Sequence, residues 1–338
     1  MANDHPGRHY AGLTSRWDRL ELSPGNSGGM TIAPSIRPRT ETHAGLDRWR
    51  TDLSLIVRDA PYAAVAAVLR EEVMRMETSI SRFRDDSELS FVNRSPGRWV
   101  SVSRYFVDVL AAALEAAAWT DGLVDPTVGA AVDAAGYRAW RAGGVPLVTA
   151  GPQPSSGDAW RDVEITPTGS HARVRIPPGT SLDLGAVAKG WLADRVARRA
   201  VDQFDADSLA NMGGDLRAIA RDEPWAVTVD PESTFAGETE FELWDGAIAT
   251  SGVGRRAWTT ADGRAAHHII DPRTGAPADT PWRTCSVLAA SAATANAAST
   301  AGIILGVAGP AWVGRQRLDA WFVGESTSQR VGQWPTEE

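Results

Sequence analysis

A glycine-containing segment near the middle of the chain combines features that favour anion binding. Residues 183–190 read D-L-G-A-V-A-K-G and are expected to lead from a strand into a helix. Glycine at such a junction lets the backbone approach a ligand closely, and the free N–H groups of a helix N-terminus attract an anion. Lys189, the single lysine of the chain, adds a positive charge. The glycine spacing does not match a Walker A loop. The segment therefore predicts a phosphate site, with a lysine on an ordinary helix surface as the alternative.

Two adjacent histidines are candidates for acid–base chemistry. His267 and His268 precede a loop framed by proline and glycine, and Asp271 follows His268 by three residues. An imidazole takes up a proton near neutral pH, and a neighbouring carboxylate can orient or charge it. We therefore predict His268 as a general base assisted by Asp271. The alternative is a structural histidine.

Two further polar segments have a structural and a functional interpretation each. Residues 211–215, N-M-G-G-D, are typical of a hairpin or bulge, with Asp215 as a capping residue. Asn296 and Thr300 lie four residues apart in an alanine-rich helix, so their side-chain oxygens share one face and could ligate a hard cation. The alternative for this second pair is a contact between helices made of small residues.

The composition narrows the class of protein. The chain has 338 residues, of which 43% are hydrophobic and 22% charged, so it suits one large domain or two small ones. A net charge of -8 argues against a sequence-independent nucleic-acid binder. We find neither a run of about 18–20 apolar residues for a membrane helix nor the apolar core of a signal peptide, which predicts a cytoplasmic protein without membrane insertion. Cys285 is the only cysteine, which excludes an internal disulfide and a cysteine-based metal site.

The expected elements mix helices and short strands without regular alternation, so the sequence favours an α+β fold over a doubly wound sheet. We expect a flexible N-terminal extension over 1–44, one domain over 45–325 and a C-terminal tail over 326–338. Ser103 should cap one of the helices. The helices are expected after Pro61, after Ser103, over 186–204 and over 294–305, and the clearest strands over 53–57, 172–176, 208–211, 225–229, 241–244, 247–250 and 285–289, with 311–323 closing the fold.

Taken in order, these segments resemble the ApbE family, the flavin transferases that use FAD and magnesium to attach FMN to a threonine or serine of a target protein. The resemblance runs from about residue 45 to residue 310. Its most specific pieces are 183–190, 211–215, 249–252 and 268–275, together with 79–88 (S-I-S-R-F-R-D-D-S-E), which is similar to S-x-Y-x-x-D-S-E, and 121–129 (D-G-L-V-D-P-T-V-G), which is similar to G-x-x-D-P-T-V-G.

The resemblance implies a fold, a site and partners. The fold would be an α+β domain with two lobes of mixed and antiparallel sheet and helices, with FAD in a central cleft. The partners would be FAD and a cytoplasmic acceptor protein with a Thr or Ser flavinylation site, with Mg²⁺ as the metal. By the resemblance, the cofactor-binding residues are Phe83, Leu123, Val124, Asp125, Lys189, Thr250, Ser251 and Ile270; the metal ligands are the Ala186 carbonyl, Asn296 and Thr300; and the catalytic residues are His268 and Asp271.

The sequence also departs from the family pattern. Typical members read A-D-A-x-S-T, whereas residues 295–300 read A-N-A-A-S-T, so Asn296 replaces a carboxylate and should weaken magnesium binding. The early Met-Gly-Thr is reduced to W-R-T at 49–51, and Gly254 and Ala257 stand where aromatic residues are common. The alternatives to a divergent transferase are an FAD pyrophosphatase giving FMN and AMP, an FAD-binding protein without turnover, and a protein that uses a different nucleotide.

Overall fold

The computed structural model describes residues 40–49, 51–143, 158–231, 236–261 and 263–335. Most of the predicted extension over 1–44 therefore lies outside the described residues. Two strands extend beyond the limits expected for the domain. Strand β1 (Glu41–Arg48) begins before residue 45, and strand β17 (Ser328–Val331) follows residue 325. The polar sequence of β1 gives little sign of a strand, because it is exposed over most of its length and, among the described strands, pairs only with its hairpin partner.

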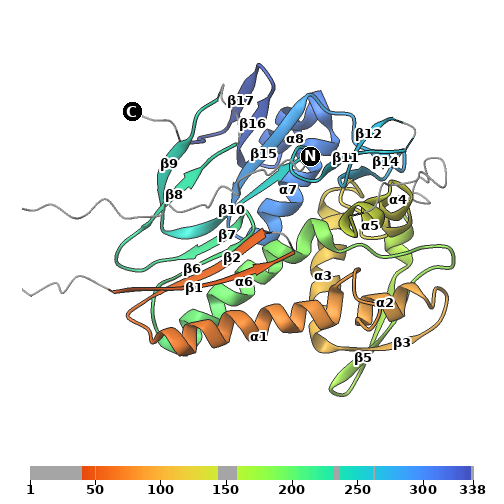
Figure 1. Ribbon diagram of the computed structural model, residues 1–338, viewed down its shortest axis with the longest axis horizontal. Coiled ribbons are helices and arrows are strands. Elements are labelled where there is room, and N and C mark those ends of the chain that lie inside the picture. The colour runs from red at the N-terminus through yellow and green to blue at the C-terminus, as the bar shows by residue number, and fades with distance from the viewer. Residues whose placement is uncertain (1–39, 50, 144–157, 232–235, 262, 336–338) are drawn as a thin grey trace, which may run out of the picture. The chain divides into compact units, whose positions relative to one another are not determined.

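An antiparallel sheet forms the centre of the fold (Figure 1). Within the described residues it has eight strands in the order β1-β2-β6-β7-β10-β15-β16-β17. All of its neighbouring strands run antiparallel, so hairpins and helical excursions connect them. The strands not yet bounded are β2 (Thr51–Arg58), β6 (Ser208–Met212), β7 (Asp215–Ile219), β10 (Asp245–Gly252), β15 (Trp282–Ala289) and β16 (Asp319–Gly324).

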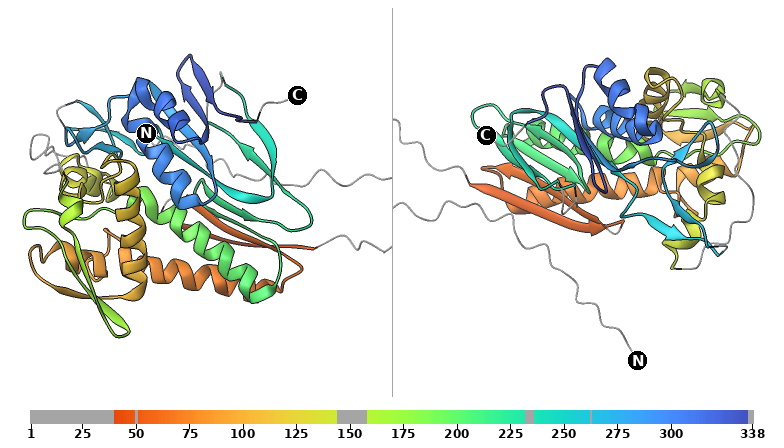
Figure 2. Two further views of the ribbon diagram at one scale, coloured as in Figure 1. Left: turned by 180° about the vertical axis from the view of Figure 1, so that it is seen from behind. Right: turned by 90° about the horizontal axis from the view of Figure 1, so that it is seen from above.

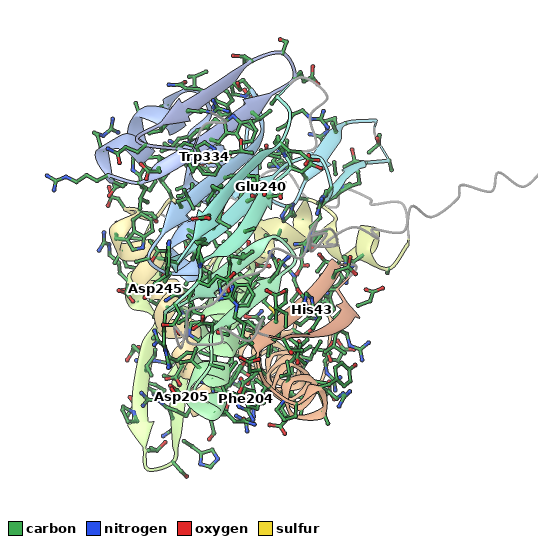
Figure 3. The ribbon with its side chains drawn as sticks, turned by 90° about the vertical axis from the view of Figure 1, so that its left-hand side faces the viewer. His43, Phe204, Asp205, Glu240, Asp245 and Trp334 are labelled. Carbon is green, nitrogen blue, oxygen red and sulfur yellow. The ribbon has the colours of Figure 1, made fainter. Side chains whose placement is uncertain are left out.

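Helices cover one face of this sheet, and α1 and α6 run side by side along it (Figure 1). The alternation of β2 explains the attachment, because Leu53, Leu55 and Val57 point into the core that the sheet shares with α1 and α6. Figure 3 shows Phe204 and Asp205 where α6 ends. The helices on this face are α1 (Tyr62–Ile80), α6 (Gly185–Phe204), α7 (Ala292–Ile304) and α8 (Gly309–Arg315), with the short 3-10 turn η2 (Gly306–Ala308).

The helices α6 and α7 approach each other closely at Gly190. A Cβ atom placed on Gly190 would lie 2.3 Å from the backbone oxygen of Ala292, so only glycine fits there. Asp194, one turn further along α6, accepts hydrogen bonds from the backbone N–H groups of Ala292 and Ala293 at 2.8 and 3.0 Å. These contacts fix the start of α7 against α6.

A hairpin of β8 (Trp225–Val229) and β9 (Thr239–Leu243) covers the opposite face of the sheet (Figure 2). Trp225 packs there with Ile56, which points away from the helices. Trp334, labelled in Figure 3, closes this second core against Trp321 with ring centroids 6.1 Å apart. The sheet is therefore buried on both faces.

A second group of elements packs at the end of α1. Ser103 caps α3 as expected, because its side chain accepts a hydrogen bond from the backbone N–H of Phe106 at 3.1 Å. Ser87 caps α2 in the same way through the N–H of Ser90. This group contains α2 (Glu88–Asn93), α3 (Arg104–Trp119), η1 (Ala159–Asp162) and a three-stranded sheet of β3 (Val100–Ser103), β5 (His171–Arg175) and β4 (Glu164–Thr168).

The remaining described elements lie nearer to α7 (Figure 1). They are α4 (Gly129–Ala134), α5 (Tyr137–Arg141) and the hairpins β11–β12 (Ala257–Thr259, Ala265–His267) and β13–β14 (Ile270–Asp271, Ala276–Pro277).

The structure confirms the predicted α+β class. The helix after Pro61, the capped helix after Ser103 and the helix over 186–204 are present, and the alanine-rich helix begins at Ala292, two residues before the expected start. Among the described helices, none is long and apolar enough to cross a membrane.

Candidate active site

A cavity of about 570 Å³ lies where the predicted segments meet. Its wall contains the start of α6, one face of α7, the end of β10 and the loops that precede α2, α4 and β13. Of the thirteen site residues predicted from the sequence, all except Asp271 line this cavity: Phe83, Leu123, Val124, Asp125, Ala186, Lys189, Thr250, Ser251, His268, Ile270, Asn296 and Thr300.

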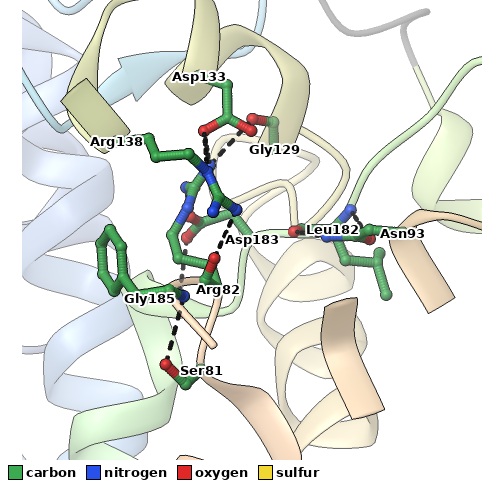
Figure 4. Close-up of polar contacts among 10 residues, drawn as sticks. Ser81, Arg82, Asn93, Gly129, Asp133, Arg138, Leu182, Asp183 and Gly185 are labelled. Carbon is green, nitrogen blue, oxygen red and sulfur yellow. Dashed lines mark hydrogen bonds and ion pairs between the residues drawn. The ribbon is translucent and has the colours of Figure 1, made fainter. Parts of the chain in front are cut away.

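Arg82 joins three of the sequence motifs (Figure 4). Its guanidinium group pairs with Asp183, donates to Asp133 at 2.7 Å and donates to the backbone oxygen of Gly129 at 3.3 Å. Asp183 in turn accepts a hydrogen bond from the N–H of Gly185 at 2.8 Å, at the start of α6. Arg82 therefore fixes the segments 79–88 and 121–129 relative to the helix that carries Lys189. The sequence analysis gave no role to Arg82, because its partners are distant in the chain.

The first turn of α6 faces the cavity with residues 184–188. No acidic side chain lies in this turn. The N–H of Gly185 donates to Asp183, and the N–H groups of Val187 and Ala188 donate to the carbonyl of Leu184, which leaves the N–H of Ala186 for an anion. This geometry agrees with the phosphate site that the sequence predicts there.

Lys189 and Asn296 meet at a buried carboxylate. Asp215 is 0% exposed, and its Oδ2 accepts hydrogen bonds from Lys189 Nζ at 2.6 Å and from Asn296 Nδ2 at 2.9 Å. Burial lowers the pKa of Lys189 and the nearby Arg256 lowers it further, whereas the charge of Asp215 opposes both. The expected capping role of Asp215 is wrong: Asn211 Oδ1 accepts from the N–H of Gly214 in the hairpin instead, at 2.9 Å.

His268 lines the cavity. Its Nδ1 is buried and has no hydrogen-bond partner among the described residues, while the ring interacts with the backbone of Arg256. Burial lowers the pKa of His268 well below its usual value, and the positive charges of Arg256, His267 and Lys189 act in the same direction. The imidazole is therefore neutral at pH 7 and able to accept a proton.

Asp271 is not the partner of His268. Its carboxylate receives Arg273 Nε at 2.9 Å, Arg273 Nη2 at 2.7 Å and the N–H of Arg273 at 2.9 Å. Its backbone oxygen accepts from the N–H of Gly275 at 2.8 Å, which closes the turn between β13 and β14. The expectation of an Asp271–His268 pair fails because the turn directs this carboxylate along the chain.

Aromatic rings form another part of the cavity wall. The ring of Phe83 is 37% exposed and meets Tyr137 edge to face at 5.6 Å. Tyr137 also stacks on Trp258 at 5.7 Å and lies 5.9 Å from the ring of His268. Offset and edge contacts of this kind suit a planar ligand. Nothing in the sequence singles out Tyr137 or Trp258, because neither belongs to the polar motifs.

Hydroxyl groups connect β10 to α7 beside Asn296. Ser251 Oγ lies 2.7 Å from Ser299 Oγ and 3.0 Å from Thr300 Oγ1, within hydrogen-bonding distance of both. Thr250 Oγ1 lies 2.8 Å from Ser286 Oγ on β15. The pairing of β10 with α7 therefore brings Thr300 and Asn296 to the cavity on one helix face, as their spacing predicts.

The oxygen atoms beside α7 could ligate a hard cation although no cluster of acidic side chains lies there in the described structure. The described residues contain no group of three His, Cys, Asp or Glu side chains able to hold a metal. However, Oδ1 of Asn296 and Oδ1 of Asp215 are both buried without a hydrogen-bond partner in the described structure. A buried acceptor without a donor is costly, so a cation that contacts Oδ1 of Asn296, which lines the cavity, would supply a missing partner.

The fold brings the start of α6, Lys189 and a neutral histidine to one cavity. A sequence profile of the ApbE family matches residues 49–322. The chain is 31% identical over 273 residues to the FAD:protein FMN transferase of Treponema pallidum (strain Nichols), covering 73% of each protein. It is 27% identical over 287 residues to the FAD:protein FMN transferase of Vibrio cholerae serotype O1, covering 82% of this chain and 85% of that protein.

Solved structures agree with the sequence comparison. The ApbE protein from Thermotoga maritima superposes with a TM-score of 0.72 at 26% identity, covering 86% of this chain and 97% of that one. The apo form of the flavinyl transferase ApbE from Pseudomonas stutzeri has the same fold, with a TM-score of 0.72 at 20% identity, covering 88% and 96%. The chain belongs to the ApbE family, as the order of its motifs predicted.

Proposed function

We propose that this protein is an FAD:protein FMN transferase that uses Mg²⁺ to move FMN from FAD to a Thr or Ser hydroxyl of an acceptor protein and releases AMP. Family membership and the names of the matched relatives support the transferase reaction. The observation that carries the proposal is the lowered pKa of His268, because this histidine lines the same cavity as Lys189 and the first turn of α6.

The chain's own residues account for binding the pyrophosphate of FAD. The N–H of Ala186 at the start of α6 receives a phosphate oxygen, and the nearby positive charges of Lys189 and Arg256 stabilise the phosphate. Asn296, Thr300 and the Ala186 carbonyl would hold Mg²⁺, which neutralises charge on the pyrophosphate and on the departing AMP. Phe83 would contact the flavin ring, since it is the exposed aromatic side chain of the wall.

His268 performs the proton transfer. Threonine and serine hydroxyls are weak nucleophiles at neutral pH, so a base must take their proton. Neutral His268 accepts that proton as the hydroxyl oxygen forms a bond to the phosphorus of the FMN half. The phosphorus–oxygen bond of the pyrophosphate breaks, and the electron pair leaves on the phosphate of AMP. The lowered pKa of His268 favours this role because the ring is unprotonated at the start.

The dependence of AMP release on the acceptor distinguishes transfer from hydrolysis of FAD and from binding without turnover. The purified chain is incubated with FAD and Mg²⁺, with and without a threonine-bearing acceptor peptide, and AMP and free FMN are measured chromatographically. Transfer predicts AMP that depends on the acceptor and little free FMN. Equal AMP and free FMN without the acceptor would indicate a pyrophosphatase, and unchanged FAD would indicate a binding protein; either result would contradict the proposal.

A further inference from the structure

Asp215 contacts both Asn296, which lies at the proposed cation site, and Lys189, which lies at the proposed phosphate site. It lies on β7, where Asp215 and Arg217 point toward α6 and α7, while Leu216 between them packs on the opposite face with β8. One carboxylate oxygen, Oδ2, takes both the ammonium of Lys189 and the amide nitrogen of Asn296. The other, Oδ1, is buried and has no hydrogen-bond partner among the described residues.

This contact fixes the orientation of the Asn296 amide. Because Nδ2 donates to Asp215 at 2.9 Å, the amide oxygen Oδ1 must point away from that carboxylate. Asn296 is only 5% exposed, it lines the cavity, and its Oδ1 has no donor in the described part of the chain. Asp215 itself does not line the cavity. The amide oxygen of Asn296 is therefore buried in the cavity wall without a donor, and the aspartate stands behind the asparagine.

The negative charge of Asp215 also favours a cation beside Asn296. A neutral amide gives a cation an oxygen but no negative charge, and charge strongly affects the affinity of oxygen ligands for hard cations. Asp215 brings a full negative charge into contact with that amide, in a buried environment where water screens it little. Lys189, which lies on α6, donates to the same carboxylate oxygen and neutralises part of this charge.

We propose that the ligand oxygen and the negative charge of the cation site are divided between two residues. Asn296 gives the oxygen, and Asp215 is a positioning residue that orients the amide and supplies the charge from behind it. The inference rests on the proposed function, because Mg²⁺ and the pyrophosphate of FAD are taken to bind together. It explains how a chain without a carboxylate at position 296 keeps a site for a divalent cation.

The test is the dependence of FAD binding on the Mg²⁺ concentration, measured from flavin fluorescence without any acceptor. Asp215→Asn should raise the half-saturating Mg²⁺ concentration by about tenfold or more, because a charge a few ångströms away in a buried site is worth at least the ~1.4 kcal/mol of one decade. The exchange variant Asp215→Asn/Asn296→Asp restores one carboxylate to the pair and should return the value to within about threefold of the wild type.

Two further variants separate a loss of Mg²⁺ affinity from a general loss of folding. Lys189→Met removes the other partner of Asp215 and should weaken FAD binding at saturating Mg²⁺ without raising the half-saturating concentration. Asn296→Asp places two carboxylates in contact, so it should lower the ligand-free melting temperature and enlarge the rise that Mg²⁺ alone produces. This second readout does not need the Asp215→Asn variant to fold.

The outcomes distinguish this inference from the proposed function. If FAD binding by the wild type does not depend on Mg²⁺, the cation of the proposed function is wrong and this inference falls with it. If the wild type depends on Mg²⁺ but Asp215→Asn leaves the half-saturating concentration unchanged, only the inference is overturned. An exchange variant no better than Asp215→Asn, or an Asn296→Asp variant with unchanged melting temperatures, would overturn it as well.

Discussion

Asp271 and Arg273 form a two-pronged ion pair, with Arg273 Nε 2.9 Å from Oδ1 and Nη2 2.7 Å from Oδ2. The pair closes the turn after β13 and engages the carboxylate that follows His268 by three residues. His268 therefore has no carboxylate to raise its pKa in the described structure, and burial together with neighbouring positive charge keeps its ring neutral. A neutral ring suits a base that must accept a proton from a hydroxyl group.

Replacement of His268 should abolish the chemistry and keep the ligand. His268→Ala is expected to lower the transfer rate by roughly 10²–10⁴-fold, the usual contribution of a positioned base, with FAD affinity within a few-fold of the wild type. Single-turnover transfer and flavin fluorescence measure the two quantities. The matched control is Asp271→Asn, which should reduce stability rather than the rate per folded molecule. A rate that survives in His268→Ala would place the base elsewhere.

The pH dependence of transfer should show an acid limb below the usual histidine range. Because the pKa of His268 is lowered, the rate should stay constant as the pH falls through about 6.5 and drop only below that value. Arg256→Gln removes a positive charge that disfavours the imidazolium, so it should raise the pKa of His268 and move the limb to higher pH. Rate profiles at saturating FAD check both statements. A limb above pH 6.5 in the wild type, or no shift in the variant, would contradict them.

The single lysine should affect both affinity and stability. Lys189→Met is expected to weaken FAD binding by roughly ten- to a hundred-fold, the loss of one charge-assisted hydrogen bond. It also leaves Asp215 buried without its ammonium partner, which should lower the free energy of unfolding by about 3–5 kcal/mol. Denaturant unfolding and flavin fluorescence measure the two effects.

A double variant separates these two effects of Lys189. Lys189→Met/Asp215→Asn removes both charges and should recover much of the stability while FAD affinity stays low. Wild-type affinity in Lys189→Met would return this residue to a purely structural role.

Arg82 should behave as a structural connection between motifs. Arg82→Lys keeps the charge but cannot reach Asp183, Asp133 and the Gly129 carbonyl together, because an ammonium lacks the planar fork of a guanidinium. We expect a loss of about 3 kcal/mol or more in the free energy of unfolding, since buried charges lose partners. Arg104→Lys, an exposed pair with Asp108 on α3, is the control and should change stability by less than about 0.5 kcal/mol. Equal effects of the two substitutions would contradict this role.

The sequence predicts the parts of the fold whose cause is local. The stripe of apolar residues on α1 and the cap at Ser103 depend on spacing within one element, and both are present. Strand β1 was missed because an edge strand with exposed side chains has no apolar alternation to detect. Twelve predicted site residues line one cavity because they lie in motifs whose order identified the family.

The contacts that the sequence did not predict depend on distant parts of the chain. Asp215 meets Asn296 across 81 positions, and Arg82 meets Asp183 across 101. The mistaken pairing of Asp271 with His268 came from the opposite cause, because proximity in sequence says nothing of where a tight turn directs a carboxylate. The geometry of the strand pleat and of the turn, rather than the residue type, determines which partner each of these carboxylates meets.

The transfer of FMN to a protein hydroxyl is tested most directly by the mass of the acceptor. An acceptor peptide with one threonine is incubated with the full chain, FAD and Mg²⁺, beside a matched peptide with valine in place of the threonine. The proposed function predicts that the threonine peptide gains the mass of one FMN moiety, located by fragmentation on the threonine oxygen, and that the valine peptide does not. An unmodified threonine peptide in the presence of bound or hydrolysed FAD would contradict it.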